Sequence, residues 1–267
     1  MPDSVVITRP LAQAGPLAAR VRALGRPVTL LPLLDISPLD DNTALHAALA
    51  TLARYAMVVF VSPNAIDAAF AHLPRPLAWP AGVTLAVLGD GSRGALAAHG
   101  VTPANASIAS PPDPANSDSE HLLASLDLAA LAGRPVLIVR GESGRELMAD
   151  GLRAAGAIVS VVAAYRRSVP PLTAALALQL TTLLVTRHDW IITSSEALRG
   201  LMGLLDRLDT DTPAAPGALS AVAKMKQQHL IVPHARIALT AGGLGFTQLT
   251  LTGSGDERLL AALQSRA

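Results

Sequence analysis

The sequence VVFVSPN at residues 58–64 decides the fold, because four apolar residues predict a buried strand and Ser62, Pro63 and Asn64 predict a turn that opens a helix. Four other segments share this arrangement: VVITRP at 5–10, LAVLGDGS at 85–92, VLIVRGE at 136–142 and IITSSE at 191–196. Strands that alternate with helices in this way are typical of βαβ units. The sequence therefore predicts an α/β protein with doubly wound parallel sheets.

These strand-to-helix junctions also predict where a ligand binds. The first N–H groups of a helix lack partners within it, and the positive end of the helix dipole lies beside them. Carboxylates and phosphates suit such positions. Because the carboxyl ends of parallel strands meet at one edge of a sheet, the junctions are expected to open together and to bind an anion there.

Length and composition narrow the class of protein. A chain of 267 residues suits two domains of moderate size, and 51% hydrophobic with only 3% aromatic residues predicts a core of Ala, Leu and Val. The net charge of +1 gives no field that would draw nucleic acid or a membrane. Cysteine is absent, which excludes disulfides, thiolate catalysis and Cys metal sites. Since Lys224 and Lys226 are the two lysines, an anion site is expected to use arginine.

The mean hydropathy of +0.41 raises the question of a membrane span. The longest apolar stretch, residues 172–186, contains Thr and Gln and is too short and polar to cross a bilayer, so a helix with one buried face is expected. The beginning of the chain, residues 1–4, has neither a basic segment nor a cleavage site. We therefore expect a cytoplasmic protein.

Two extended segments with prolines, near 30–39 and 161–171, interrupt the alternation. They are expected to be the linkers where two doubly wound domains meet. The pattern leaves open whether the first domain is continuous. Residues 102–119 and 206–217 are expected to be loops, and the strand that begins at 158 is expected to end at 162.

Several motifs bear on the chemistry that the protein can perform. Residues 89–94 have the glycine spacing of a dinucleotide fingerprint, but no acidic residue at a strand end follows about 20 residues later, so NAD binding is not favoured. No Walker, H-E-x-x-H or G-x-S-x-G motif occurs. The seven histidines are scattered and are expected at the surface or at helix caps, with His234 set apart because it opens a helix beside Arg236.

The turn RGESGR at 140–145 is more specific, because two glycines let a ligand approach between two arginines. The alternative is an ordinary strand-to-helix turn with a solvated Arg145. Tyr165 is one of two tyrosines and is expected between the domains, either as a proton donor or as a packing residue. Residues 59–66 echo residues 191–198, through duplication or through the same local constraints.

The order and spacing of these segments resemble the uroporphyrinogen-III synthase family over nearly the whole chain. The segments that carry the resemblance are ITRP at 7–10, PLLDISP at 32–38, FVSPNA at 60–65, RGE at 140–142, GREL at 144–147, YRR at 165–167, and RIA at 236–238 before GF at 245–246. The turn at residues 89–92 departs from the family's usual pattern, because Asp90 would lie beside a polyanion.

The resemblance implies two flavodoxin-like, doubly wound parallel-sheet domains joined by a two-stranded linker. It implies a discontinuous first domain of residues 1–35 and 167–267 and a second domain of residues 38–164. It also implies a lyase of porphyrin and heme biosynthesis that cyclises hydroxymethylbilane to uroporphyrinogen III, with inversion of ring D and with no cofactor or metal.

The implied substrate is a linear tetrapyrrole with eight carboxylates, received by transient handover from hydroxymethylbilane synthase. The enzyme is expected to be a monomer with no nucleic-acid or membrane partner. The alternative is a two-lobed binding protein that closes on an anionic small molecule without catalysis.

The candidate site residues follow strand ends and are expected to face one interdomain space. Tyr165 is the expected catalytic acid. Ser62 and Ser194 are expected to share substrate carboxylates with backbone N–H groups, so that losing either costs less than losing Tyr165. The expected substrate-binding residues are Thr8, Arg9, Ser62, Asn64, Ser92, Arg140, Gly141, Ser194, Ser195 and Arg236.

Overall fold

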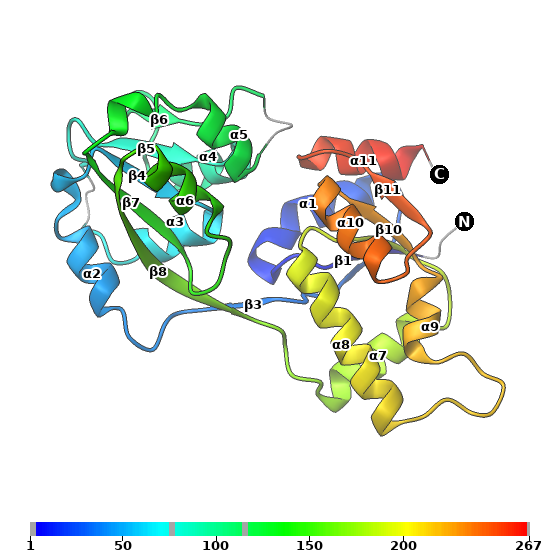
Figure 1. Cartoon of the computed structure of the whole chain (residues 1–267). Helices are drawn as coiled ribbons and strands as arrows, with labels where there is room; N and C mark the ends of the chain where they lie inside the picture. The colour runs from blue at the N-terminus through cyan, green and yellow to red at the C-terminus, as the bar shows by residue number, and fades with distance from the viewer. Residues whose placement is uncertain (1–3, 75–77, 114–116, 266–267) are drawn as a thin grey trace. The chain divides into compact units, whose positions relative to one another are not determined.

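The computed structural model describes residues 4–74, 78–113 and 117–265. The chain forms two compact units (Figure 1): domain 1 contains Met1–Asp35 and Ser168–Ala267, and domain 2 contains Ile36–Arg167. The chain passes from one unit to the other twice, at residues 35–36 and 167–168. In the described ranges, no helix is long and apolar enough to cross a membrane.

Domain 1 has a five-stranded sheet in the order β11-β10-β9-β1-β2, and every neighbouring pair is parallel. In chain order within the domain this is 2-1-3-4-5 read from the β2 edge, the flavodoxin order. The order reverses between β1 and β9, which makes their carboxyl ends the topological switch point. The strands are β1 (Val5–Ile7), β2 (Val28–Leu30), β9 (Asp189–Ile191), β10 (His229–Val232) and β11 (Leu249–Leu251).

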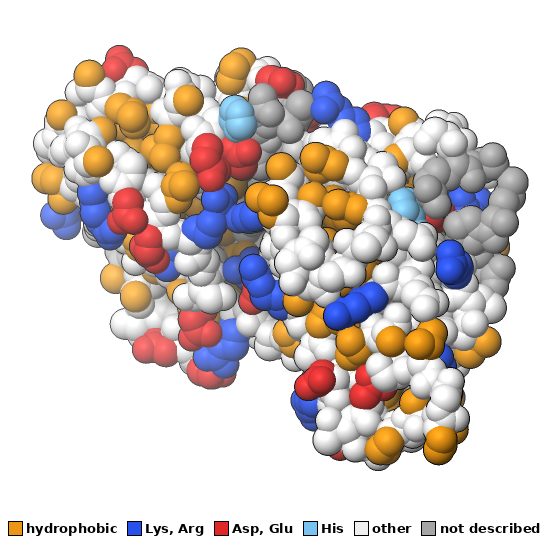
Figure 2. All heavy atoms as spheres, turned by 45° about the vertical axis from the view of Figure 1, so that its right-hand side comes forward, with side chains coloured by type: hydrophobic (Ala, Val, Ile, Leu, Met, Phe, Trp, Pro, Cys, Tyr) orange, Lys and Arg blue, Asp and Glu red, His pale blue; other side chains and the backbone are white. Residues whose placement is uncertain are grey.

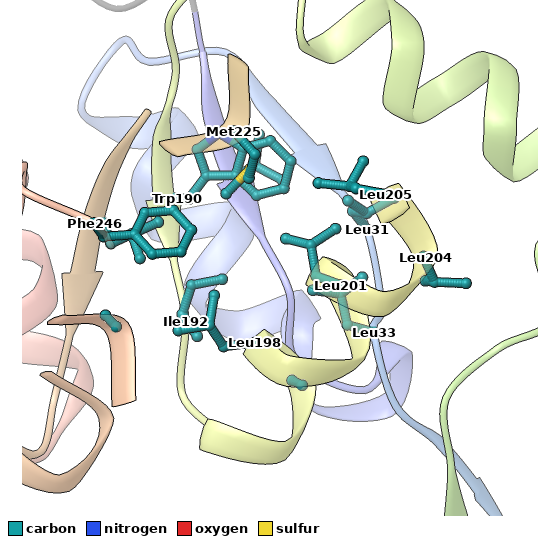
Figure 3. Packing of buried hydrophobic residues seen from close by; sticks show 14 of the residues in the cluster. Leu31, Leu33, Trp190, Ile192, Leu198, Leu201, Leu204, Leu205, Met225 and Phe246 are labelled. Atoms are coloured by element: carbon teal, nitrogen blue, oxygen red, sulfur yellow. The ribbon is translucent and has the colours of Figure 1, made fainter. Parts of the chain in front are cut away.

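Helices cover both faces of this sheet because successive strand residues point to opposite faces. Val5, Ile7, Ile191 and Ile231 pack against α1 and α11. On the other face the core residues belong to a second cluster with α7, α8, α9 and α10, where Trp190 and Ile192 meet leucines of α8 (Figure 3). The helices are α1 (Leu11–Ala23), α7 (Ala174–Leu183), α8 (Ser195–Asp211), α9 (Ala221–Lys226), α10 (Ala235–Gly243) and α11 (Asp256–Gln264).

Domain 2 has a six-stranded sheet in the order β3-β8-β7-β4-β5-β6. Its strands from β4 to β8 are parallel to their neighbours and have the 3-2-1-4-5 order, which is also doubly wound. The switch point lies between β4 and β7. The strands are β3 (Asp35–Ser37), β4 (Met57–Phe60), β5 (Thr84–Val87), β6 (Ile108–Ala109), β7 (Pro135–Gly141) and β8 (Ile158–Ser168).

The core of domain 2 is likewise divided by its sheet. Val58, Phe60 and Val139 face α2, α3 and α4, whereas Val59 and Ile138 face α5 and α6. The α-helices are α2 (Thr43–Leu49), α3 (Pro63–Phe70), α4 (Asp90–Ala98), α5 (Ser119–Ser125) and α6 (Leu147–Ala154), and short 3₁₀ turns span Leu52–Arg54 and Ala129–Leu131.

The predicted fold class is confirmed: both units are doubly wound α/β domains, and β3 and β8, the strands at the two crossings, are hydrogen-bonded neighbours. Three local predictions were wrong. Strand β8 continues to Ser168 because its pairing with β7 extends to Tyr165. Helix α8 continues to Asp211, and Leu208 beyond the predicted end packs against the core of domain 1. Strand β6 lies inside the predicted loop 102–119.

Candidate active site

The carboxyl edge of domain 2 is built around Ser62, which follows β4 at the switch point. Ser62 has an extended backbone and caps helix α3, and its Oγ accepts the N–H of Ala65 at 3.1 Å. Pro63 begins the helix, where its missing N–H costs no hydrogen bond. The local sequence Ser-Pro-Asn-Ala therefore places a hydroxyl beside the positive end of the α3 dipole.

The hydroxyl of Tyr165 contacts that of Ser62 from inside the domain. The Tyr165 Oη and the Ser62 Oγ are 3.0 Å apart, and the tyrosine is 3% exposed within the core that α3 and α4 share with the sheet. A register shift between Arg140 and Gly141 brings Gly141 opposite Tyr165. A Cβ added at Gly141 would lie 3.0 Å from the Tyr165 Cζ. The glycine is thus required for the close approach of β7 to the phenol ring.

The arginines around the 141–146 turn are held by acidic residues. Arg140 Nη2 binds Glu146 at 2.6 Å and Nη1 donates to the Arg145 carbonyl at 3.1 Å. Arg145 itself binds Glu120 at 2.6 Å. Arg145 is nevertheless exposed, and its hydrogen bond holds the pKa of the Glu120 carboxyl below its usual value. That a ligand binds in this turn stays a prediction.

A further ion pair, that of Arg166 with Glu142, links the same turn to β8. Arg166 binds Glu142 at 2.8 Å and Asp40 at 3.1 Å. The hydrogen bond from Arg166 lowers the pKa of Glu142, and the bonds to Glu142 and Asp40 raise the pKa of Arg166. Together with the pairs of Arg140 and Arg145, this contact connects the turn after β7 to β8 and to α5.

The other two candidates of domain 2 lie on helices near the same edge. Asn64 is half-buried in the first turn of α3. Ser92 is 4% exposed in the first turn of α4, and its N–H donates to the Gly89 carbonyl at 3.0 Å. Because Ser92 is buried and its N–H is already bonded to Gly89, the structure gives this residue little access to a ligand.

The carboxyl edge of domain 1 repeats this plan. Thr8 follows β1, is buried, and donates its hydroxyl to the Ile191 carbonyl of β9 at 2.8 Å. Ser194 caps α8, and its Oγ accepts the N–H of Ala197 at 3.3 Å. Ser195 is buried and accepts a hydrogen bond from the Thr240 hydroxyl at 3.1 Å.

The two basic candidates of domain 1 lie in different settings. Arg9 forms an ion pair with Asp256 of α11 at 2.7 Å, and both side chains are largely shielded. Arg236 is exposed in the first turn of α10, next to the cap residue His234. Acidic and basic side chains are interspersed on the face of the chain in Figure 2, in keeping with the near-zero net charge.

The echoed segments 59–66 and 191–198 form the same structure in the two domains. In each, a strand at the switch point leads to a serine cap that accepts the N–H three residues later. Ser62 and Ser194 differ in one respect, because in the described part of the chain the tyrosine contact belongs to Ser62. Thus the structure brings Ser62, Gly141 and Tyr165 together in domain 2, and Thr8 and Ser194 to one edge of domain 1. That all ten binding residues face one space stays a prediction.

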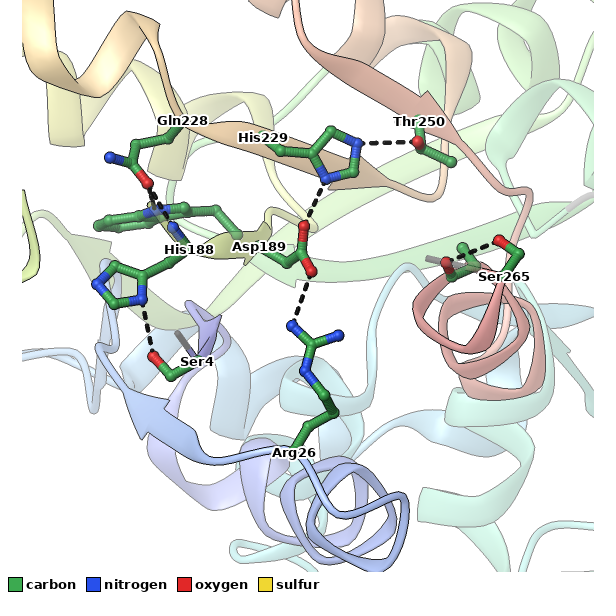
Figure 4. A network of polar contacts seen from close by, with 10 residues as sticks. Ser4, Arg26, His188, Asp189, Gln228, His229, Thr250 and Ser265 are labelled. Carbon is green, nitrogen blue, oxygen red and sulfur yellow. Dashed lines mark hydrogen bonds and ion pairs between the residues drawn. The ribbon is translucent and has the colours of Figure 1, made fainter. Parts of the chain in front are cut away.

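A buried polar network that the sequence pattern did not reveal lies at the opposite, amino edge of domain 1. Asp189 is fully buried, and it binds Arg26 at 2.9 Å and His229 at 2.8 Å (Figure 4). His188 is also buried and lies 3.0 Å from the Ser4 hydroxyl. The expectation that these two histidines lie at the surface or at helix caps was wrong. The polar sequence Arg-His-Asp directly before an apolar strand was the available signal.

Among the described residues, no group of three or more His, Cys, Asp or Glu side chains is arranged to hold a metal ion. The side chains and helix ends at the carboxyl edges supply hydroxyls, a phenol, guanidinium groups and unpaired N–H groups. Such groups bind carboxylates and donate protons.

Comparison with known proteins gives the family of this chain. The family model for uroporphyrinogen-III synthase HemD matches residues 15–234. The uroporphyrinogen-III synthase of Salmonella typhimurium strain LT2 is 31% identical over 264 residues, which is 98% of this chain and 100% of the relative. That of Escherichia coli K12 is 30% identical with the same coverage.

Solved structures support the fold. A mutant uroporphyrinogen III synthase from the extremely thermophilic bacterium Thermus thermophilus aligns with a TM-score of 0.56, 13% identity and coverage of 98% of both chains. The enzyme from Helicobacter pylori 26695 aligns with a TM-score of 0.55 and 14% identity, covering 98% of this chain and 99% of that one.

Proposed function

The chain belongs to the uroporphyrinogen-III synthase family, and we propose that it cyclises hydroxymethylbilane to uroporphyrinogen III as a cofactor-free lyase. The observation that carries this function is the match to curated synthases at about 30% identity over their whole length. It places the protein in tetrapyrrole biosynthesis and favours the enzyme over a binding protein without catalysis.

The reaction requires the protein to assist departure of the substrate's hydroxyl and to hold the linear chain in the orientation that inverts ring D. Loss of the substrate's hydroxyl as water gives an electrophilic azafulvene, and attack on it from the substituted carbon of ring D gives a spiro intermediate. Fragmentation and reclosure then invert ring D. Because the type I isomer forms without an enzyme, the protein must hold the chain so that the inverted closure is faster, and orientation can supply much of that advantage.

The carboxyl edge of each domain is suited to hold the substrate's carboxylates. The caps Ser62 and Ser194 each present a hydroxyl beside a helix N-terminus, at the switch point of their own sheet. Arg9 and Arg140 are paired with acidic residues, but a guanidinium has five N–H donors and can also bind a substrate carboxylate. We assign substrate binding to these groups together with Thr8, Asn64, Ser92, Gly141, Ser195 and Arg236.

Proton donation to the departing hydroxyl is assigned to the Tyr165 phenol. Its contact with Ser62, at the edge where the substrate is expected, supports this role. We expect Tyr165→Phe to lower kcat for the type III product by about a hundredfold or more, with a smaller change in KM, since a positioned acid contributes about 10²–10⁴-fold. Unchanged turnover would make Tyr165 a packing residue.

The decisive experiment supplies the purified protein with freshly generated hydroxymethylbilane and separates the type I and type III products by chromatography after oxidation. The proposed enzyme yields type III in excess over the uncatalysed type I product. Binding of hydroxymethylbilane with only type I product would instead identify a binding protein.

We further propose that the protein acts as a cytoplasmic monomer that receives its substrate by transient transfer from hydroxymethylbilane synthase. Sedimentation analysis tests the monomer, and the rate of type III formation with and without that synthase tests the transfer. A stable oligomer of this chain contradicts the monomer. A linear dependence of the type III rate on the free hydroxymethylbilane concentration, unaffected by added inactive synthase, contradicts the transfer.

A further inference from the structure

We propose that Ser62 is a second catalytic residue, which transfers the proton of the Tyr165 phenol to the leaving hydroxyl. The inference rests on the proposed function and concerns the path of the proton. It gives Ser62 a larger role than that of a carboxylate ligand helped by backbone N–H groups.

Burial is the first reason. Tyr165 is 3% exposed, so its phenol is enclosed by its own domain. One side of the ring lies against Gly141, close enough that a Cβ there would be 3.2 Å from Cε2 and 3.3 Å from Oη. The polar neighbour of its hydroxyl is Ser62, 3.0 Å away and only half-buried. Of the two hydroxyls, that of Ser62 is the one with access to a ligand at the carboxyl edge.

The hydrogen-bonding capacity of Ser62 is the second reason. A serine hydroxyl has one hydrogen to donate and two lone pairs. One lone pair of the Ser62 Oγ accepts the N–H of Ala65. If the phenol of Tyr165 donates to the other lone pair, the hydrogen of Ser62 is left to point to the substrate. The cap contact fixes the Oγ and leaves one route for the proton, from Tyr165 Oη to Ser62 Oγ to the leaving oxygen.

Charge is the third reason. When the proton moves, negative charge develops on the Tyr165 oxygen and, in passing, on Ser62. Ser62 caps α3, so the positive end of the helix dipole lies beside this charge. The dipole therefore stabilises the state in which the proton has left for the substrate.

The proton balance closes over the reaction. The C–O bond of the hydroxymethyl group breaks, its electron pair and the proton from Ser62 leave as water, and the pyrrole nitrogen supplies electrons to form the azafulvenium cation. Tyr165 reprotonates Ser62 and becomes a phenolate. Ring closure and rearomatisation later release one proton from carbon, and this proton restores the phenol through Ser62.

Ser194 provides a matched control within the same chain. It caps α8 as Ser62 caps α3, and its Oγ likewise accepts the N–H three residues later. Its described partners include no tyrosine. Ser62→Ala and Ser194→Ala therefore remove the same cap and the same kind of carboxylate contact, but only Ser62→Ala interrupts the proposed proton path.

The test measures type III formation by Ser62→Ala, Ser62→Thr, Ser194→Ala, Tyr165→Phe and the double variant Ser62→Ala/Tyr165→Phe. We expect Ser62→Ala and Tyr165→Phe each to lose about a hundredfold or more in kcat, and the double variant to lose no more than the worse single variant. Ser62→Thr keeps a hydroxyl and is expected within about tenfold of the parent. Ser194→Ala is expected to act mainly through a several-fold higher KM.

A solvent isotope effect separates proton transfer from structure. In D₂O the parent is expected to show a reduced kcat, because two protons move, and the reduction is expected to disappear as the path is broken in Ser62→Ala. Urea unfolding checks that both serine variants are folded. The inference is overturned if Ser62→Ala behaves as Ser194→Ala does, or if it keeps the parent's isotope effect. If the parent itself forms no type III product, the proposed function fails instead.

Discussion

Replacing Asp189 by Asn tests how the buried network at the amino edge of domain 1 stabilises the protein. Asp189 is fully buried, and the Arg26 side chain that it binds at 2.9 Å is 10% exposed. Asn keeps the shape of the side chain and can still accept a hydrogen bond from His229, but it removes the negative charge. The Arg26 guanidinium is then a buried cation that has lost the carboxylate of residue 189 as its counterion.

The magnitude follows from the burial of this pair. Removing one partner of a buried ion pair typically costs about 3–5 kcal/mol, because the remaining charge loses both water and its counterion. With an m-value of about 2 kcal/mol per molar urea, the unfolding midpoint of domain 1 should fall by about 1.5–2.5 M. Replacing both partners, in Arg26→Met/Asp189→Asn, should recover most of this loss because no charge stays unpaired.

The assay uses the distribution of the two tryptophans. Trp190 lies in the core of domain 1 and Trp79 packs in domain 2. In a Trp79→Phe background, fluorescence during urea unfolding reports domain 1 alone, which matters because a two-domain protein need not unfold in one step. Glu257→Gln is the matched control, since it breaks the exposed Arg20–Glu257 pair of the same domain and should leave the midpoint nearly unchanged. A midpoint for Asp189→Asn no lower than that of Glu257→Gln would refute the reasoning.

Two further predictions concern domain 2. Gly141→Ala should destabilise this domain by about 1–3 kcal/mol in a urea titration, because the added Cβ presses on the ring of Tyr165. Gly94→Ala is the control: the new Cβ meets open space on helix α4, so this variant should be as stable as the parent or more stable. The arginine partners of Glu120 and Glu142 lower the pKa values of these carboxyls from 4.5, so the stability that the two ion pairs add is present above pH 4.5 and is lost as the pH falls below it. The double variant Glu120→Gln/Glu142→Gln should therefore lose less stability between about pH 5 and 3 than the parent does. An unchanged slope of stability against pH would contradict this origin.

The candidate site was predictable where it depends on local sequence. A serine after an apolar strand and before a helix is a cap wherever it occurs, so the positions of Ser62 and Ser194 followed from the pattern. The contact between Ser62 and Tyr165 did not follow, because the two residues are 103 positions apart and meet through the pairing of β7 with β8 and the register shift at Gly141. Nor did the pattern reveal that Arg140 and Arg145 bind acidic partners.

The sequence by itself determined the kind of fold. Apolar runs that end in capping turns specify parallel strands and helices through local energetics, and their repetition specifies doubly wound domains. Tertiary structure alone decided which polar segments are ordered and which charges are buried. Helix α9 begins where the Asp209 carboxylate, 12 residues away, accepts the N–H of Ala221, and Arg26 meets Asp189 across 163 residues. The physical reason is that a polar side chain has no intrinsic preference for burial. The cost of removing it from water is offset only by a partner that the fold brings near, and the sequence pattern does not contain that partner's position.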